Sequence, residues 1–239
     1  MANKDITFSI LCPTRKRPDS MERLTKSIFN MAENPKKVEI IFYIDSDDLE
    51  SKEKADELKQ EYEIEYIIGE RIVLSDMWNK CYNRARGSIC FQGGDDIIMR
   101  TQGWDTQIAA KFDEIDDKIG FVFGDDMSRG HPLGHFGTHG FLHRNWIDTA
   151  GYFSPSCFSC DWGDTWLNDI AKMINRHYFV PIITEHMHPN LQKAEWDQVH
   201  LDRLERGKKD NVEQKYRDLY KERVEVADKL LKFIKEFKK

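Results

Sequence analysis

The sequence predicts an α/β protein with a mainly parallel sheet, helices on both faces of that sheet, and a helical extension at the C-terminal end. Three observations support this fold class. Short apolar runs, each typical of a buried strand, recur along the chain. Segments with helical spacing separate these runs, an alternation typical of parallel sheets covered by helices. After Asn190 the chain is highly charged, and from Val212 its apolar residues again have helical spacing.

The first half of the chain contains four predicted strands separated by three predicted helices. The strands cover residues 6–12, 38–44, 64–68 and 88–91. The first helix follows Pro18, because Asp19 and Glu22 have the spacing of a capping box, and it ends before Pro35. The other two helices cover about residues 51–62 and 74–82, the second with apolar residues on one face.

The second half is less regular. A strand is predicted at residues 119–123, and the Gly-, His- and Pro-rich segment 124–140 is expected to be a long functional loop. Residues 141–147, a helix at about 163–174 and a strand at 178–183 complete the compact part. We therefore expect one domain over residues 1–196 and a charged helical extension over residues 197–239 that packs on it.

Composition limits the class of protein. The 239 residues include 36 Lys and Arg against 42 Asp and Glu, so the net charge of −6 excludes a basic, non-specific nucleic-acid coat protein. A local basic rim stays possible, formed by Arg203, Arg206, Lys208 and Lys209. Five scattered cysteines favour a reducing compartment. Since we find neither a membrane-spanning run nor a signal peptide, we expect a cytoplasmic protein.

Asp95 and Asp96 are the most informative polar pair. They follow the strand at 88–91 through two glycines, and ligands of parallel sheets bind beyond the carboxyl ends of the strands. Adjacent carboxylates there suit Mg²⁺ or Mn²⁺, which prefer oxygen ligands and bridge to phosphates. A solvated acidic turn is the alternative, and the position after a strand favours the cation site.

Histidines provide a second set of candidates. His186 and His188 follow the strand at 178–183, and one imidazole could complete a metal shell begun by Asp96; a structural or surface role is the alternative. His131, His135 and His139 resemble a metal cluster by composition, but they lack a firm ligand spacing. Acceptor contacts or simple loop polarity are the preferred interpretation for these three.

Asp164 opens the predicted helix at 163–174. A helix N-terminus stabilises a carboxylate, so this residue is either a helix cap or a general base at the edge of the cleft. Asp161, three residues earlier, is the reserve candidate for the base. Cys157 and Cys160 form a single C-x-x-C with no second pair, and we interpret them as structural.

The order of these motifs resembles that of the GT-A (Rossmann-like) glycosyltransferases of the family-2 type, over roughly residues 6–196. The resemblance rests on the segments Cys12–Pro18, Tyr43–Asp48, Trp78–Lys80, Gly93–Ile97, Gly103-Trp104, Gly163–Trp166 and Glu185–His188. The combination is more specific than any single motif. Glu185–Pro189 together with Lys193–Asp197 also resembles small glycosyltransferases encoded by bacteriophages, which would place the protein in the host cytoplasm.

The resemblance implies a sugar-nucleotide donor, expected to be a UDP-sugar, with Mn²⁺ or Mg²⁺ as cofactor. It implies that Asp96 and His186 are metal ligands and that Asp164 is the catalytic base of an inverting transfer. Gly94 stands where the family's Asp-x-Asp motif has its first acid. The residues implied for donor binding are Pro13, Thr14, Arg15, Arg17, Asp45, Asp47, Trp78, Asn79, Gly94 and Asp95.

The acceptor is less constrained. The loop at 124–140 should border the acceptor side of the cleft through Asp125, Asp126, Arg129 and His139. A glycan and a hydroxymethylated base in phage DNA are both open as acceptors. Two other classes also stay open: a nucleotidyltransferase, although the segment after the first strand lacks the Gly-rich phosphate loop of that class, and a non-catalytic sugar-binding protein.

Overall fold

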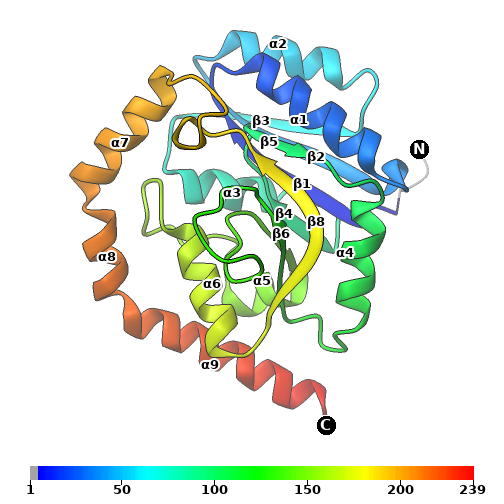
Figure 1. Cartoon of the computed structure of the whole chain (residues 1–239), viewed down its shortest axis with the longest axis vertical. Coiled ribbons are helices and arrows are strands. Elements are labelled where there is room, and N and C mark those ends of the chain that lie inside the picture. Colours follow the sequence, from blue (N-terminus) through cyan, green and yellow to red (C-terminus); the bar gives the residue numbers. More distant parts are fainter. Residues whose placement is uncertain (1–4) are drawn as a thin grey trace.

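The computed structural model describes residues 5–239, and within them eight strands form one mixed sheet (Figure 1). The strand order is β3-β2-β1-β4-β7-β6-β8-β5. The strands are β1 (Phe8–Thr14), β2 (Val38–Asp45), β3 (Ile64–Gly69), β4 (Ile89–Gln92), β5 (Ile97–Met99), β6 (Phe121–Asp125), β7 (Gly140–His143) and β8 (His177–His186).

Nine α-helices accompany the sheet in this described part of the chain. They are α1 (Pro18–Met31), α2 (Leu49–Leu58), α3 (Leu74–Tyr82), α4 (Trp104–Asp113), α5 (Arg144–Ala150), α6 (Gly163–Met173), α7 (Gln198–Asp210), α8 (Val212–Asp218) and α9 (Tyr220–Phe237). Two short 3-10 helices cover Pro35–Lys37 and Pro189–Leu191. The α/β class predicted from the sequence is confirmed.

The sheet is parallel in its first half and mixed in its second. Strands β3, β2, β1 and β4 run parallel, and β6 and β8 are also parallel neighbours. Strand β7 lies antiparallel between β4 and β6, and β5 is antiparallel to β8. The apolar pattern predicted the other six strands but neither β5 nor β7. These two bring in the antiparallel pairings, which depend on how the long segments before them return to the sheet.

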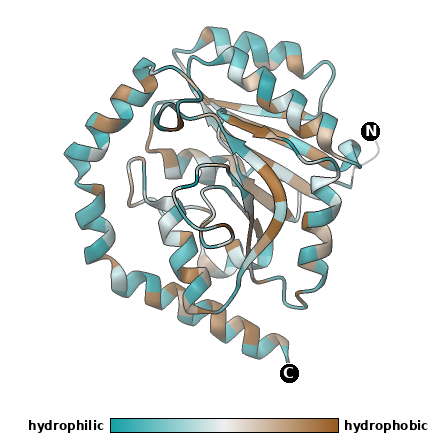
Figure 2. Ribbon diagram, in the orientation of Figure 1, coloured by the Kyte–Doolittle hydropathy of each residue, from teal (hydrophilic) through white to brown (hydrophobic). Residues whose placement is uncertain are grey.

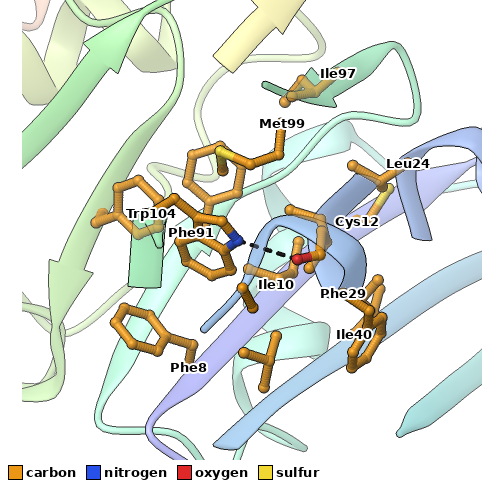
Figure 3. Packing of buried hydrophobic residues seen from close by; sticks show 14 of the residues in the cluster. Phe8, Ile10, Cys12, Leu24, Phe29, Ile40, Phe91, Ile97, Met99 and Trp104 are labelled. Atoms are coloured by element: carbon orange, nitrogen blue, oxygen red, sulfur yellow. Dashed lines mark hydrogen bonds between the residues drawn. The ribbon is translucent and has the colours of Figure 1, made fainter. Parts of the chain in front are cut away.

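Both faces of the sheet are covered by helices, as the buried strands require. All seven residues of β1 are buried, and alternate side chains point to opposite faces. Phe8 and Ile10 belong to the apolar core under α1, α2 and α4, whereas Leu11 belongs to the core under α3, α5, α6 and α9. In the first core the indole of Trp104 donates to the carbonyl of Ile28 at 3.1 Å, so its one polar atom is satisfied (Figure 3).

Two predicted helix starts differ from the structure. Helix α1 begins at Pro18 with Arg17 as N-cap, so the capping box predicted for Asp19 and Glu22 is wrong. Proline is favoured in the first turn because its missing N–H would be unpaired there anyway. Helix α2 begins at Leu49, two residues earlier than predicted, because the side chain of Asp48 accepts from the backbone N–H of Ser51.

The C-terminal helices α7, α8 and α9 run along the outside of the molecule (Figure 1). Helix α9 packs on α5 and α6 through an apolar stripe, and hydrophobic and hydrophilic residues alternate along its ribbon (Figure 2). The buried residues of that stripe include Val226, Ala227, Leu230 and Ile234. Within residues 5–239, no helix has the length and apolarity that crossing a membrane would require.

Candidate active site

A pocket of about 280 Å³ opens at the carboxyl ends of β1, β2 and β4, which is where ligands of parallel sheets bind. It collects side chains from distant parts of the chain. Of the residues predicted for the site, its lining contains Pro13, Thr14, Arg15, Arg17, Asp45, Trp78, Gly94, Asp95, Asp96, His139, Asp164 and His186.

Five residues predicted for the site lie outside the lining. Asp47 is exposed and paired with Arg15. Asn79 holds the backbone of Phe153 and Ser154 through its side-chain amide, which indicates a structural contact. The exposed Arg129, in the loop after β6, forms an ion pair with Asp125 at the end of that strand. Asp126 accepts a hydrogen bond from the hydroxyl of Thr138.

One wall of the pocket carries a carboxylate with an unused oxygen. Asp45, at the end of β2, is only 2% exposed. Its Oδ2 accepts from Arg15 Nη1 at 2.8 Å, whereas Oδ1 is buried and lacks a hydrogen-bond partner among the described residues. Burial raises the pKa of Asp45, although Arg15 acts in the opposite direction. Such an acceptor can take a hydrogen bond from an N–H or O–H of a ligand.

Asp95 has a different environment from its neighbour Asp96. Its two oxygens accept from Thr14 Oγ1 at 2.8 Å and from Arg17 Nη1 at 3.0 Å. Arg17 also donates to both oxygens of Asp197, at 2.7 and 2.8 Å. Burial raises the pKa of Asp95 to about 6 despite the charge of Arg17. This carboxylate therefore ties β1 to the start of α7 and has little capacity left for a ligand.

Asp96, His139 and His186 form a three-residue cluster whose ligand atoms all lie within 4.8 Å of one another. His186 Nε2 lies 3.1 Å from Asp96 Oδ2. Burial raises the pKa of Asp96, but the hydrogen bond and charge of His186 outweigh this effect and hold that pKa well below its usual range. The pKa of His186 is raised by Asp96 even though burial opposes the charged ring.

The tautomer of His139 leaves one ring nitrogen available. Nδ1 lies 2.9 Å from the carbonyl oxygen of Gln92, so Nδ1 carries the proton and donates it. Nε2 is then an unprotonated acceptor, and it is buried without a partner in the described structure. Burial lowers the pKa of His139 to about 4, which keeps the ring neutral. A ring held by a carbonyl in this way is typical of metal-ligating histidines.

The cluster fits a divalent transition-metal ion such as Mn²⁺ better than Mg²⁺, because imidazole nitrogens bind transition metals whereas Mg²⁺ prefers oxygen ligands. One carboxylate and two imidazoles provide a mixed oxygen and nitrogen ligand set. Gly94 lies close to it, since a Cβ added at that position would stand 2.7 Å from Asp96 Oδ1 and 3.6 Å from His139 Cε1. His139, predicted for the acceptor side, thus lies beside the two predicted metal ligands.

Asp164 occupies the first turn of α6 on the pocket wall. It is half-buried, and its Oδ1 accepts from the backbone N–H of Thr165 at 2.7 Å. Burial raises the pKa of Asp164 to about 6, with the Thr165 N–H opposing this shift. Trp162, the N-cap of this helix, has a φ of +75°, a conformation that is strained for a bulky residue. Its ring packs against Tyr216 of α8.

Sequence reasoning missed several residues of the pocket. Helix α7 contributes His200 and the two arginines of the predicted basic rim, Arg203 and Arg206, while Arg71 enters from the segment after β3. Arg71 follows a predicted strand. The rule that ligands bind beyond strand ends could therefore have placed Arg71 in the site, as it placed Asp45. No local signal could have found the α7 residues, since their neighbours are distant in sequence: His200, for example, contacts Arg17, 183 positions earlier.

Comparison with known proteins gives a fold relationship. No family model and no curated protein sequence matches the chain. Among solved structures, S. aureus TarS matches with a TM-score of 0.60 at 12% identity, over 75% of this chain and 35% of TarS. A TarS 1–349 complex with UDP matches with a TM-score of 0.58 at 11% identity, over 74% of this chain and 57% of that chain.

The mannosyltransferase PcManGT from Pyrobaculum calidifontis, in complex with GDP-Man and Mn²⁺, matches with a TM-score of 0.57 at 12% identity. That match covers 76% of this chain and 57% of the mannosyltransferase. The chain thus spans less than two thirds of the length of these proteins. At such identities the likeness concerns the fold, and the protein has the α/β fold of these GT-A-like glycosyltransferases.

Proposed function

We propose that the protein is a metal-dependent, inverting glycosyltransferase that moves a sugar from a nucleoside-diphosphate donor, a UDP-sugar, to a hydroxyl acceptor. The observation that carries the proposal is that one pocket combines the Asp96–His139–His186 cluster with a carboxylate whose pKa is raised to about 6. The fold is shared with proteins solved in complex with UDP and GDP-Man.

In this proposal, Asp96, His139 and His186 would hold the divalent cation, Mn²⁺ in preference to Mg²⁺. The ion, when bound, supplies positive charge that neutralises the diphosphate leaving group. Gly94 replaces the first acid of the family's Asp-x-Asp motif, and His139 provides the third ligand in this chain. Asp45 accepts a hydrogen bond from the nucleoside through its unused Oδ1, and Pro13 and Thr14 line the same pocket.

Asp164 acts as general base. Its carboxylate takes the proton of the acceptor hydroxyl while the acceptor oxygen forms a bond to the anomeric carbon. The bond between that carbon and the phosphate oxygen breaks on the opposite face, and its electron pair leaves with the nucleoside diphosphate. A base with a pKa of about 6 is ionised at neutral pH and still has a useful affinity for the proton.

In this proposal the acceptor binds at the part of the pocket wall beside Asp164. Trp162 lines the pocket next to the base, and an aromatic face suits a ring compound such as a sugar or a nucleobase. A glycan and a hydroxymethylated base in DNA both meet this requirement. Incubation with labelled donor and each acceptor in turn decides between them, since the label enters only the true acceptor.

We further propose that residues 1–196 are the catalytic domain and that residues 197–239 are an extension packed on it. We also propose that the protein works in the cytoplasm, which is that of a host cell if a phage encodes it.

Donor turnover tests the central proposal. The expected result is release of UDP from a UDP-sugar with Mn²⁺ or Mg²⁺ and none with a chelator. Donor binding without turnover, with every acceptor class supplied, would instead support a sugar-binding protein, and release of pyrophosphate from a nucleoside triphosphate would support a nucleotidyltransferase.

A further inference from the structure

Two arginine side chains of α7 enter the pocket with hydrogen-bonding capacity that the protein leaves unused. Arg203 and Arg206 both line the pocket, and the Nε of each is buried without a hydrogen-bond partner in the described part of the chain. For Arg206, no hydrogen bond or ion pair is formed with any of residues 5–239. An unpaired, buried Nε is costly, because its N–H has lost water and gained no hydrogen bond in exchange.

The charges around Arg206 increase this cost. Burial lowers the pKa of Arg206, and the nearby positive charge of Arg71 lowers it further. Arg71 already shares its own charge between Asp202, at 2.9 Å, and Asp45, at 3.9 Å. The positive charges of Arg71 and Arg206 therefore lie near each other in the pocket lining, and no carboxylate among residues 5–239 forms an ion pair with Arg206.

Arg203 lies one turn earlier on the same helix and contacts His188, a neighbour of the Asp96–His139–His186 cluster. Its Nη1 is 3.2 Å from His188 Nε2 and 3.5 Å from an oxygen of the partly exposed Asp161. The ring of His188 is 5.2 Å from the ring of His186, centroid to centroid. Within the same pocket, Arg203 thus lies on the side of the histidines, and Arg206 lies near enough to Arg71 and Asp45 to feel their charges.

We propose that Arg203 and Arg206, with Arg71 beside them, form a phosphate-binding subsite, at which α7 holds a phosphate group of a bound substrate. Guanidinium groups present paired N–H donors whose spacing matches phosphate oxygens, and such charge-assisted bonds would satisfy the unused Nε groups. The proposal rests on the proposed function for the identity of the substrates. The phosphate belongs either to the diphosphate of the donor or to a phosphate carried by the acceptor.

The first test measures affinity by calorimetry for UDP, uridine and inorganic phosphate, in the presence of a chelator so that the metal does not contribute. The variants are Arg206→Gln and Arg203→Gln, and the matched control is Lys208→Gln, which removes the same charge from an exposed position of the same helix. If the donor supplies the phosphate, each arginine variant binds UDP about tenfold to a hundredfold more weakly than wild type. Uridine affinity and the Lys208→Gln control stay unchanged.

The second test identifies an acceptor phosphate. Here the arginine variants bind UDP normally, and wild-type protein saturated with UDP still binds inorganic phosphate, whereas the Arg206→Gln variant does not. The proposal is overturned if the arginine variants bind both UDP and inorganic phosphate as the Lys208→Gln control does. If wild-type protein binds phosphate through Arg206 but does not bind UDP even when Mn²⁺ replaces the chelator, the subsite stands and the proposed function fails.

Folding of the variants is checked by thermal unfolding. Should Arg206→Gln fail to fold, Arg206→Lys replaces it, because lysine keeps the charge but lacks the paired donors. The expected result for Arg206→Lys is an intermediate loss of affinity, and wild-type affinity in that folded variant would contradict a guanidinium subsite.

Discussion

Asp96 and His186 are neighbours because the short strand β5 pairs antiparallel with the end of β8. In that register Ile97 stands opposite His186, and the backbone N–H of Met187 donates to the carbonyl of Asp96 at 2.7 Å. Two residues 90 positions apart are therefore held within hydrogen-bond distance by main-chain pairing. Two of the three residues of the cluster with His139 are thus positioned by paired strands, which hold side chains more precisely than loops alone do.

The first prediction concerns the cation. Asp96→Asn, His139→Gln and His186→Gln each remove one ligand of the cluster, so each variant should bind Mn²⁺ at least about tenfold more weakly than wild type. Manganese binding followed by electron paramagnetic resonance measures this directly. His131→Gln, on the exposed part of the loop, is the control and should bind Mn²⁺ normally.

The second prediction separates the two adjacent aspartates. Asp95 is occupied by Thr14 and Arg17, so Asp95→Asn should lose stability more than metal affinity. Asp96→Asn should show the reverse. Urea unfolding and Mn²⁺ titration of both variants provide the comparison, and equal loss of metal affinity in the two would contradict the assignment of Asp96 as the principal acidic ligand.

The third prediction concerns Asp164. If this residue abstracts the acceptor proton, Asp164→Asn should keep donor affinity and lose turnover by about a hundredfold or more.

The Asp164→Asn variant should also unfold at a higher temperature at pH 7, because the native protein no longer has to hold an ionised carboxylate in a poorly solvated place. The gain is at most about 3 kcal/mol, from the difference between a pKa of about 6 and the ordinary 3.8. Near-normal turnover would leave Asp164 only its structural contact with the backbone N–H of Thr165 in the first turn of α6.

The fourth prediction is the pH dependence that follows from the same group. The base must be ionised, so turnover of a saturated enzyme should rise as the pH increases through about 6 and fall about tenfold per unit below it. Stability changes in the opposite direction: the folded state binds the Asp164 proton more tightly than the unfolded state, so this contribution grows as the pH falls from 6 to 4. The Asp164→Asn variant should lose both dependences.

The fifth prediction tests whether α9 is part of the folded core. Leu230 is fully buried against the domain, so Leu230→Ala should lower the free energy of unfolding by about 2–5 kcal/mol. Leu201→Ala, at a position of α7 that is 47% exposed, is the control and should change stability by less than about 1 kcal/mol. Chemical denaturation measures both, and equal stabilities would show that α9 is not packed as described.

Part of the site could be predicted from local sequence. Strands β1, β2 and β4 are apolar runs that end in polar residues, so the positions of Thr14, Asp45 and Asp96 at one edge of the sheet follow from the pattern alone. The physical reason is that parallel strands separated by helices must all end on the same side. The start of α6, and with it Asp164, was also visible in the local pattern.

Only the tertiary structure determined the rest. The antiparallel insertion of β7 brings His139 to Asp96 and His186, and docking of the extension brings Arg203 and Arg206 of α7 into the pocket. These placements depend on strand order, register and helix docking across long stretches of chain. Hydrophobic periodicity reports which face of an element is buried but not which distant element buries it, and for that reason the third candidate ligand and the two arginines could be located only in the folded chain.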